Sequence, residues 1–134
     1  GRTWTATDST IPTGESAGVF SLTFKNPRLG LALGGDFATP TDGVDSSAYT
    51  RDGRTWRNGG DMGQLGEDAA WLSGLGHVVL VTGESGDTAG TDVSLDDGRT
   101  WRPLTDRGWH TLDCTDDRSC WAAGGNGRVA RLRY

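Results

Sequence analysis

Short stretches in which large apolar residues alternate with small or polar ones run along the whole chain. Residues 18–24 (Gly-Val-Phe-Ser-Leu-Thr-Phe) have this pattern, which is typical of a strand with one buried face. Residues 29–35 are a denser run of small and apolar residues, suited to the centre of a crowded sheet. We find no long run with helical periodicity. The pattern predicts an all-β protein built from many short strands.

The predicted strands fall into groups of four. The first group comprises residues 18–24, 29–35, 46–51 and a strand that begins at 56; the second comprises 68–72, 77–83, 91–95 and 100–104. The third group comprises 109–114, 120–124 and 128–132 and has no fourth strand, while residues 2–7 predict one outer strand ahead of the first group. Glycines recur after the second strand of every group, at 34–35, 83 and 124–125. Their recurrence supports a repeat.

A tetrapeptide, Gly-Arg-Thr-Trp, occurs three times, at residues 1–4, 53–56 and 98–101. The copies start 52 and 45 residues apart. This spacing is that of a four-stranded propeller blade, not of a helical repeat. We therefore divide the chain into the last strand of one blade (1–12), two complete blades (13–60 and 61–106) and three strands of a fourth (107–134).

The third copy lies in a loop whose residues suit a tight turn between antiparallel strands. In Ser94–Trp101 the Asp96 carboxylate can accept hydrogen bonds from nearby backbone N–H groups, and Gly98 can adopt a backbone angle that other residues resist. In the second copy, alignment on Trp56 places Tyr49 and Arg51 where the third has Ser94 and Asp96. Either that loop is one residue shorter, with Asp52 in the aspartate's role, or it is degenerate.

The pattern Ser-x-Asp-x-Gly-x-Thr-Trp resembles the Asp box, or BNR repeat, of sialidase-like propellers, and residues 94–101 match it at every defined position. Residues 24–35 and 120–130 also resemble the blades of photosystem II stability and assembly factor-like propellers. The resemblance implies an exported Asp-box β-propeller without a fixed chemistry. It assigns structural roles to two sets of loop residues: Asp52, Gly53, Thr55 and Trp56, and Ser94, Asp96, Gly98, Thr100 and Trp101.

The strands amount to about three four-stranded blades, whereas closed propellers use roughly four to eight. We therefore expect part of a larger or oligomeric ring. Either a second copy completes it, giving six blades from two chains, or the missing N-terminal part of a longer protein does. We favour the fragment, since a natural chain rarely begins inside its own turn motif.

Charge and cysteine content limit the classes of partner and the cellular compartment that we expect for this protein. The net charge is −5, with 18 acidic residues, so no basic face for nucleic acid is expected. No apolar run is long enough to span a membrane. Cys114 and Cys120 flank a five-residue turn and predict a disulfide, which belongs in an oxidising or secreted environment. Zinc would need two further ligands. We assign no metal and no cofactor.

The sequence favours a binding role over catalysis. Sialidase-like enzymes need an arginine triad, a nucleophilic tyrosine activated by a glutamate, and an acid/base aspartate, but Tyr49 and Tyr134 suit no central pocket. We assign no catalytic residue. We expect a non-catalytic scaffold that binds a protein or glycan through its channel face, and the alternative is a sialidase-like glycoside hydrolase with catalytic residues partly in missing blades. The candidate binding residues are Glu15, Glu67, Trp71, Trp109 and His110.

Overall fold

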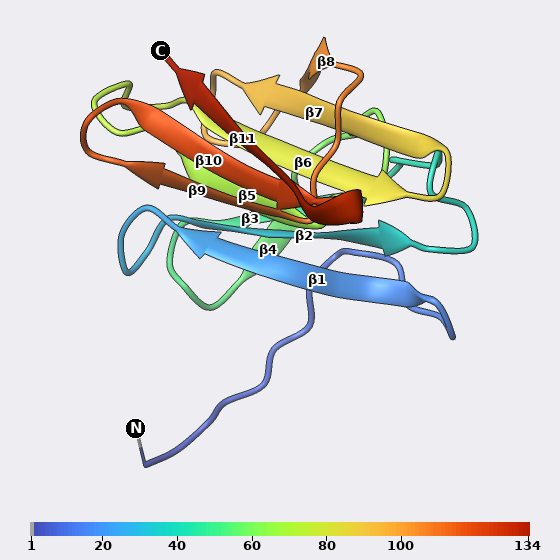
Figure 1. Cartoon of the computed structure of the whole chain (residues 1–134). Helices are drawn as coiled ribbons and strands as arrows, with labels where there is room; N and C mark the ends of the chain where they lie inside the picture. The colour runs from blue at the N-terminus through green and yellow to red at the C-terminus, as the bar shows by residue number, and fades with distance from the viewer. Residues whose placement is uncertain (1) are drawn as a thin grey trace.

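The computed structural model describes residues 2–134, which form three antiparallel sheets (Figure 1). Sheet 1 contains β1 (Ala17–Phe24), β2 (Gly30–Asp36), β3 (Ser47–Thr50) and β4 (Trp56–Asn58). Sheet 2 contains β5 (Asp68–Trp71), β6 (Val79–Ser85), β7 (Thr88–Ser94) and β8 (Arg102–Thr105). Sheet 3 contains β9 (Thr111–Thr115), β10 (Ser119–Gly124) and β11 (Arg128–Arg133), with a 3₁₀ turn at Gly125–Gly127. The predicted all-β fold class is confirmed.

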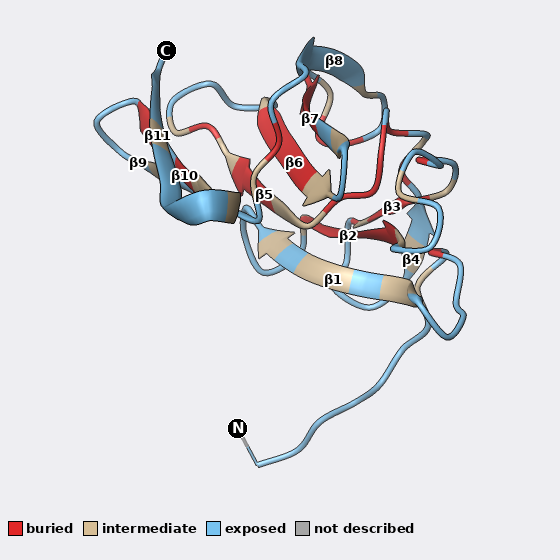
Figure 2. Ribbon diagram, turned by 45° about the vertical axis from the view of Figure 1, so that its right-hand side comes forward, coloured by how far each residue is buried: buried red, intermediate tan, exposed pale blue. Residues whose placement is uncertain are grey.

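In every sheet the strands pair in chain order, so each sheet is a simple meander. The first strands meet at one side of the molecule, where β5 packs against both β1 and β9. The sheets thus stack face to face, sheet 2 in the middle. Buried residues concentrate on β2 and β6, whereas β8, β11 and the N-terminal segment are exposed (Figure 2).

Two apolar cores hold the three sheets together. Leu31 and Leu33 of sheet 1 pack against Val79 and Val81 of sheet 2, and all four are fully buried. Between sheets 2 and 3, buried side chains form a second core from the opposite face of sheet 2: Ala70, Leu72, Leu80, Val93, Leu112, Cys120 and Ala122. Alternation along β6 therefore supplies both interfaces, because successive strand side chains point to opposite faces.

One carboxylate joins the three first strands. Asp68, at the start of β5, accepts hydrogen bonds from the Ser21 hydroxyl of β1 (2.8 Å) and from the Leu112 N–H of β9 (2.8 Å). It also accepts one from the Thr111 hydroxyl (3.0 Å). Asp68 thus fixes the position of both neighbouring sheets relative to sheet 2.

Residues 2–7, which were predicted as an outer strand, form no strand within the described chain. Residues 2–9 have no regular secondary structure and extend away from the sheets (Figures 1 and 2), and Gly1 of the first tetrapeptide lies outside the described residues. A strand requires a neighbour that supplies its ladder hydrogen bonds, and within residues 2–134 none lies beside this segment. Its assignment to the last strand of another blade therefore stays a prediction, as do the other segment boundaries.

The loop from Ser94 to Trp101 is closed by its own side chains. The Asp96 carboxylate accepts hydrogen bonds from the Thr100 N–H (2.9 Å) and the Thr100 hydroxyl (2.8 Å). The Ser94 hydroxyl donates to Asp96 (2.8 Å) and accepts from the Gly98 N–H (2.8 Å). Gly98 has φ +79°, a conformation that favours glycine.

The loop before Trp56 has the same bonds with one residue fewer. The Asp52 carboxylate accepts from the Thr55 N–H (2.8 Å) and hydroxyl (2.7 Å), and the Thr50 hydroxyl takes the part that Ser94 has in the longer loop. Of the two alternatives for this copy, these bonds favour the shorter loop with Asp52 as its acceptor.

We predict that acid weakens the fold through these loops. Hydrogen bonds from Thr55 and Arg54 lower the pKa of Asp52 far below its ordinary value. Partial burial works to raise the pKa of Asp96, but hydrogen bonds from Thr100 and Ser94 outweigh burial and leave that pKa lowered. A lowered folded-state pKa stabilises the fold above the unfolded value, about 4, and this stabilisation is lost as the pH falls through the folded value. Melting temperatures should therefore drop below about pH 4.

Asp96→Asn tests this cause directly. The variant should lose less of its melting temperature than the parent between about pH 5 and pH 2, because one of the titrating carboxylates is gone. Asp87→Asn, in the exposed turn between β6 and β7, is the matched control and should follow the parent. Equal acid sensitivity of Asp96→Asn and the parent would contradict the assignment.

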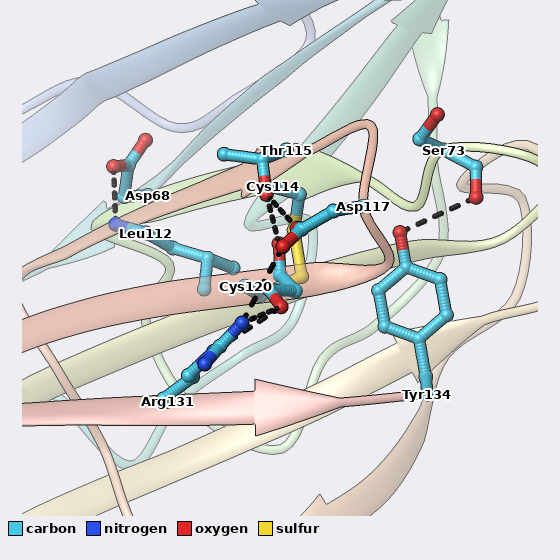
Figure 3. The surroundings of a disulfide bond; sticks show 10 residues. Asp68, Ser73, Leu112, Cys114, Thr115, Asp117, Cys120, Arg131 and Tyr134 are labelled. Atoms are coloured by element: carbon cyan, nitrogen blue, oxygen red, sulfur yellow. Dashed lines mark hydrogen bonds and ion pairs between the residues drawn. A yellow bond between two sulfur atoms is a disulfide. The ribbon is translucent and has the colours of Figure 1, made fainter.

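Cys114 and Cys120 form a disulfide across β9 and β10, as the sequence predicted (Figure 3). The two residues are direct cross-strand partners, with Cα atoms 4.0 Å apart. Figure 3 also shows the Tyr134 hydroxyl donating to the Ser73 carbonyl nearby. Cys120 is fully buried in the core between sheets 2 and 3, so the bridge anchors the hairpin where it meets that core.

Replacing both cysteines by alanine should lower the free energy of unfolding by about 2 kcal/mol, the amount expected for closing so short a loop. Urea denaturation measures this change. A reducing agent should destabilise the parent similarly and leave the double variant unchanged. If the denaturation midpoint of the parent were the same with and without the reducing agent, the prediction would be refuted.

Candidate binding site

Three of the candidate residues precede the first strands of the sheets. Glu15 lies two residues before β1, Glu67 directly before β5, and His110 directly before β9. Because β1, β5 and β9 pack side by side and start at the same end, these residues belong to one end of the molecule. We call it the start end.

Glu67 and His110 meet at the start end. The His110 Nδ1 lies 2.9 Å from Glu67 Oε2, and the same carboxylate oxygen accepts a hydrogen bond from the Glu84 backbone N–H (2.8 Å). The Glu67 side chain is only 13% exposed, whereas that of His110 is 52% exposed. The backbone bond holds Glu67 in place, and the carboxylate then orients an imidazole that faces solvent.

Two residues that were not among the candidate binding residues, Glu84 and Arg128, complete the group. Arg128 donates to Glu84 Oε2 (2.7 Å) and to the Gly125 carbonyl, and its guanidinium lies 4.8 Å from the centre of the Trp109 ring. Glu84 directly follows Gly83, the glycine that recurs in the second strand of each group, and this repeat position is the one sequence signal that could have placed Glu84 at the start end. We call Glu67, Glu84, Trp109, His110 and Arg128 the start-end cluster.

Trp71 and Glu15 do not join the cluster. Trp71 ends β5 and lies under Lys25, whose Nζ is 5.1 Å from the ring centre. Lys25 also pairs with Asp97 (3.2 Å), which pairs with His77 (2.7 Å), and all of these lie at the opposite end of the sheets. Glu15 shares the start end but lies in an exposed loop. The structure thus brings together three of the five candidates.

The cluster presents a guanidinium, an indole and an imidazole above two largely buried carboxylates. Arg and Trp offer a large contact area with directed hydrogen bonds, which suits recognition of a polypeptide. The tyrosines lie elsewhere: Tyr49 packs in the core between sheets 1 and 2, and Tyr134 packs against the other core. Among residues 2–134, no group of three or more His, Cys, Asp or Glu side chains could hold a metal ion.

Residues 2–134 contain no helix with the length and apolar character needed to cross a membrane. No protein-family model matches the chain, and no curated protein matches it significantly. A search of solved structures finds YCF48, a β-propeller, in a structure described as YCF48 bound to D1 peptide. The similarity has a TM-score of 0.64 at 16% identity, covers 88% of this chain, and spans 38% of the YCF48 chain. The three sheets therefore have the fold of part of a β-propeller.

Proposed function

We propose that the chain is part of a non-catalytic propeller scaffold that binds a protein partner at the start end, the mouth of the channel that a closed ring would have. The start-end cluster carries this proposal. Its acidic members are fixed by backbone and side-chain bonds, so His110 and Arg128 are presented in one orientation. Preorganised groups lose little entropy on binding.

Two further observations support the choice of partner and compartment. YCF48 has a related fold and was solved with a D1 peptide, which makes a peptide the first ligand class to test. The Cys114–Cys120 disulfide belongs in an oxidising environment, and we infer an exported protein. We also infer that the loops at residues 50–56 and 94–101 are Asp boxes, from the hydrogen bonds that they share.

A peptide array probed with the purified chain tests the proposal. We expect a subset of peptides to bind, and we expect Arg128→Ala to weaken their affinity by at least about tenfold, as loss of an interface arginine does. Arg133→Ala, which removes an exposed arginine at the far end of β11, is the matched control and should bind as the parent does.

A parallel glycan array and a fluorogenic sialoside assay cover the other classes. Selective glycan binding without peptide binding, or turnover of the sialoside, would contradict the proposed protein-binding role. Peptide binding that Arg128→Ala leaves unchanged would show that the start-end cluster is not the site.

A further inference from the structure

Trp101 wedges between sheets 1 and 2. Its ring packs against the core that contains Val79 and Val81, and its indole N–H donates to the Ser47 hydroxyl (3.1 Å) and the Gly59 carbonyl (3.1 Å). The Ser47 hydroxyl in turn donates to the Gly60 carbonyl (2.9 Å). The tryptophan of one blade's loop thus fills the space between its own sheet and the preceding one.

The equivalent space between sheets 2 and 3 is a cavity of about 290 Å³. Sheet 3 lines it with apolar side chains, among them Leu112, Ala122 and Ala130. Its volume lies at the lower limit for a drug-sized ligand. A single large side chain is the more suitable occupant.

The sheet 2 wall of this cavity repeats the polar partners of Trp101. Thr91 lies three residues before Ser94, just as Ser47 lies three residues before Thr50, and both occupy the third strand of their sheet. The Thr91 hydroxyl donates to the Arg107 carbonyl (2.7 Å), as the Ser47 hydroxyl does to Gly60, and Thr91 lines the cavity. The Thr82 hydroxyl also lies 3.1 Å from the Thr91 oxygen, and the second lone pair of that oxygen can accept an indole N–H.

Thr105, which also lines the cavity, is the β8 partner of Thr91, as Gly59 lies opposite Ser47 in sheet 1. The backbone carbonyl at this position is the second acceptor of the indole in the filled interface. Next to the cavity, β11 pairs with β10 alone among residues 2–134, so within the described chain its other edge is open to a fourth strand. The site has both a slot for a tryptophan and an edge for the strand that carries it.

Residues 2–7 carry the matching group. Trp4 ends a tetrapeptide identical to the one that ends at Trp101, and it is 100% exposed. The Thr7 hydroxyl donates to the Arg54 carbonyl (3.0 Å), and Ile11 is buried against Ala32 and Ala48. These contacts hold the segment on the face of sheet 1 that points away from sheet 2.

The segment cannot reach the cavity of its own chain. Three extended residues from Thr7 to Trp4 span about 10 Å, whereas crossing two sheet interfaces requires about 20 Å. A second copy has no such limit. Two copies of three sheets give six blades, which is within the range of closed propellers. Head-to-tail contacts that close into a ring leave no free interface for a further copy.

We propose that Trp4 of a second copy inserts into the cavity between sheets 2 and 3 while its residues 2–7 pair with the free edge of β11. The flanks that would then meet carry exposed apolar side chains. Leu22 and Phe24 lie on sheet 1, and Trp121 and Val129 lie on sheet 3. Exposed apolar surface of this kind marks interaction sites.

Sedimentation of the chain over a range of concentrations tests the proposal. We expect the parent to reach twice 14.2 kDa and Trp4→Ala to weaken association by at least about 30-fold for each of the two contacts, the loss typical of a central interface tryptophan. Trp4 is fully exposed within the chain, so its replacement should leave the melting temperature of the monomer unchanged. Thr5→Ala, at the neighbouring position, is the matched control and should associate like the parent.

Ala130→Trp fills the slot from the side of the cavity and should weaken association as Trp4→Ala does. A parent that stays monomeric at every concentration overturns the proposal, and then some other segment or partner covers the slot. Dimers that form equally well with Trp4→Ala also overturn it. Trp109 of the start-end cluster also lines the cavity, but Arg128 does not, so the effect of Arg128→Ala on peptide binding tests the proposed function separately.

Discussion

Replacing Asp68 by alanine is expected to lower the free energy of unfolding by about 3 kcal/mol. The carboxylate accepts hydrogen bonds from β1 and β9 as well as from its own strand, where the Ala69 N–H donates to it (2.9 Å). A bond to a charged group contributes about 1.5–3 kcal/mol. Truncation would also leave the N–H of the buried Leu112 without its acceptor. Urea denaturation measures the loss.

Two variants show whether the bonds of Asp68 are the cause. Asp113→Ala removes an exposed carboxylate from β9 and should change stability by less than about 0.5 kcal/mol. Asp68→Asn keeps the side-chain shape but turns an acceptor into an NH₂ group, so its stability should lie between those of the parent and the alanine variant. An alanine variant as stable as Asp113→Ala would show that packing alone holds the first strands together.

The sequence predicted most of the sheet structure because its signals are local. Alternation along residues 18–24 and the repeated tetrapeptide each depend on a few neighbouring residues, and the strands lie within a few residues of their predicted ranges. The β6–β7 hairpin differs most. Gly83 suggested the end of a strand, but Glu84 and Ser85 continue the ladder by pairing with Ala89 and Thr88. Pairing across the hairpin outweighed the local preference of polar residues for a loop.

The candidate site could be predicted only in part because it depends on contacts between sheets. Glu67 and His110 each directly precede the first strand of a sheet. Because the repeat places equivalent residues at one end of the molecule, their contact could be anticipated from the sequence. The Arg128–Glu84 pair joins residues 44 positions apart on neighbouring sheets, and no short pattern indicates such a pair. Trp71 and Trp109 were both candidate binding residues from the sequence, yet they lie at opposite ends of the sheets. Residues 2–7 read as an outer strand for the same reason: a local pattern does not show whether a partner strand is present.

Gly83→Ala should be as damaging as the loss of Asp68, at about 3 kcal/mol. A Cβ at this position would lie inside van der Waals distance of the Leu65 carbonyl oxygen, and Leu65 is buried. A backbone carbonyl cannot move aside as a flexible side chain can, so the loop before β5 would have to shift. At the equivalent glycine of sheet 1, Gly34, a Cβ would meet the Gly18 carbonyl in the same way. Close backbone approach therefore explains why the repeat has glycine toward the end of its second strand.

Gly18→Ala is the matched control for this prediction, since Gly18 also lies in a strand but no atom lies within 4 Å of its potential Cβ. Alanine there restricts the unfolded chain without a clash and should leave stability unchanged or raise it by up to about 1 kcal/mol. Thermal and urea denaturation of both variants separate steric cost from the general effect of removing a strand glycine. Equal stability of the two variants would mean that the loop containing Leu65 can shift without a loss of stability. The close backbone approach would then not explain the glycine at this repeat position.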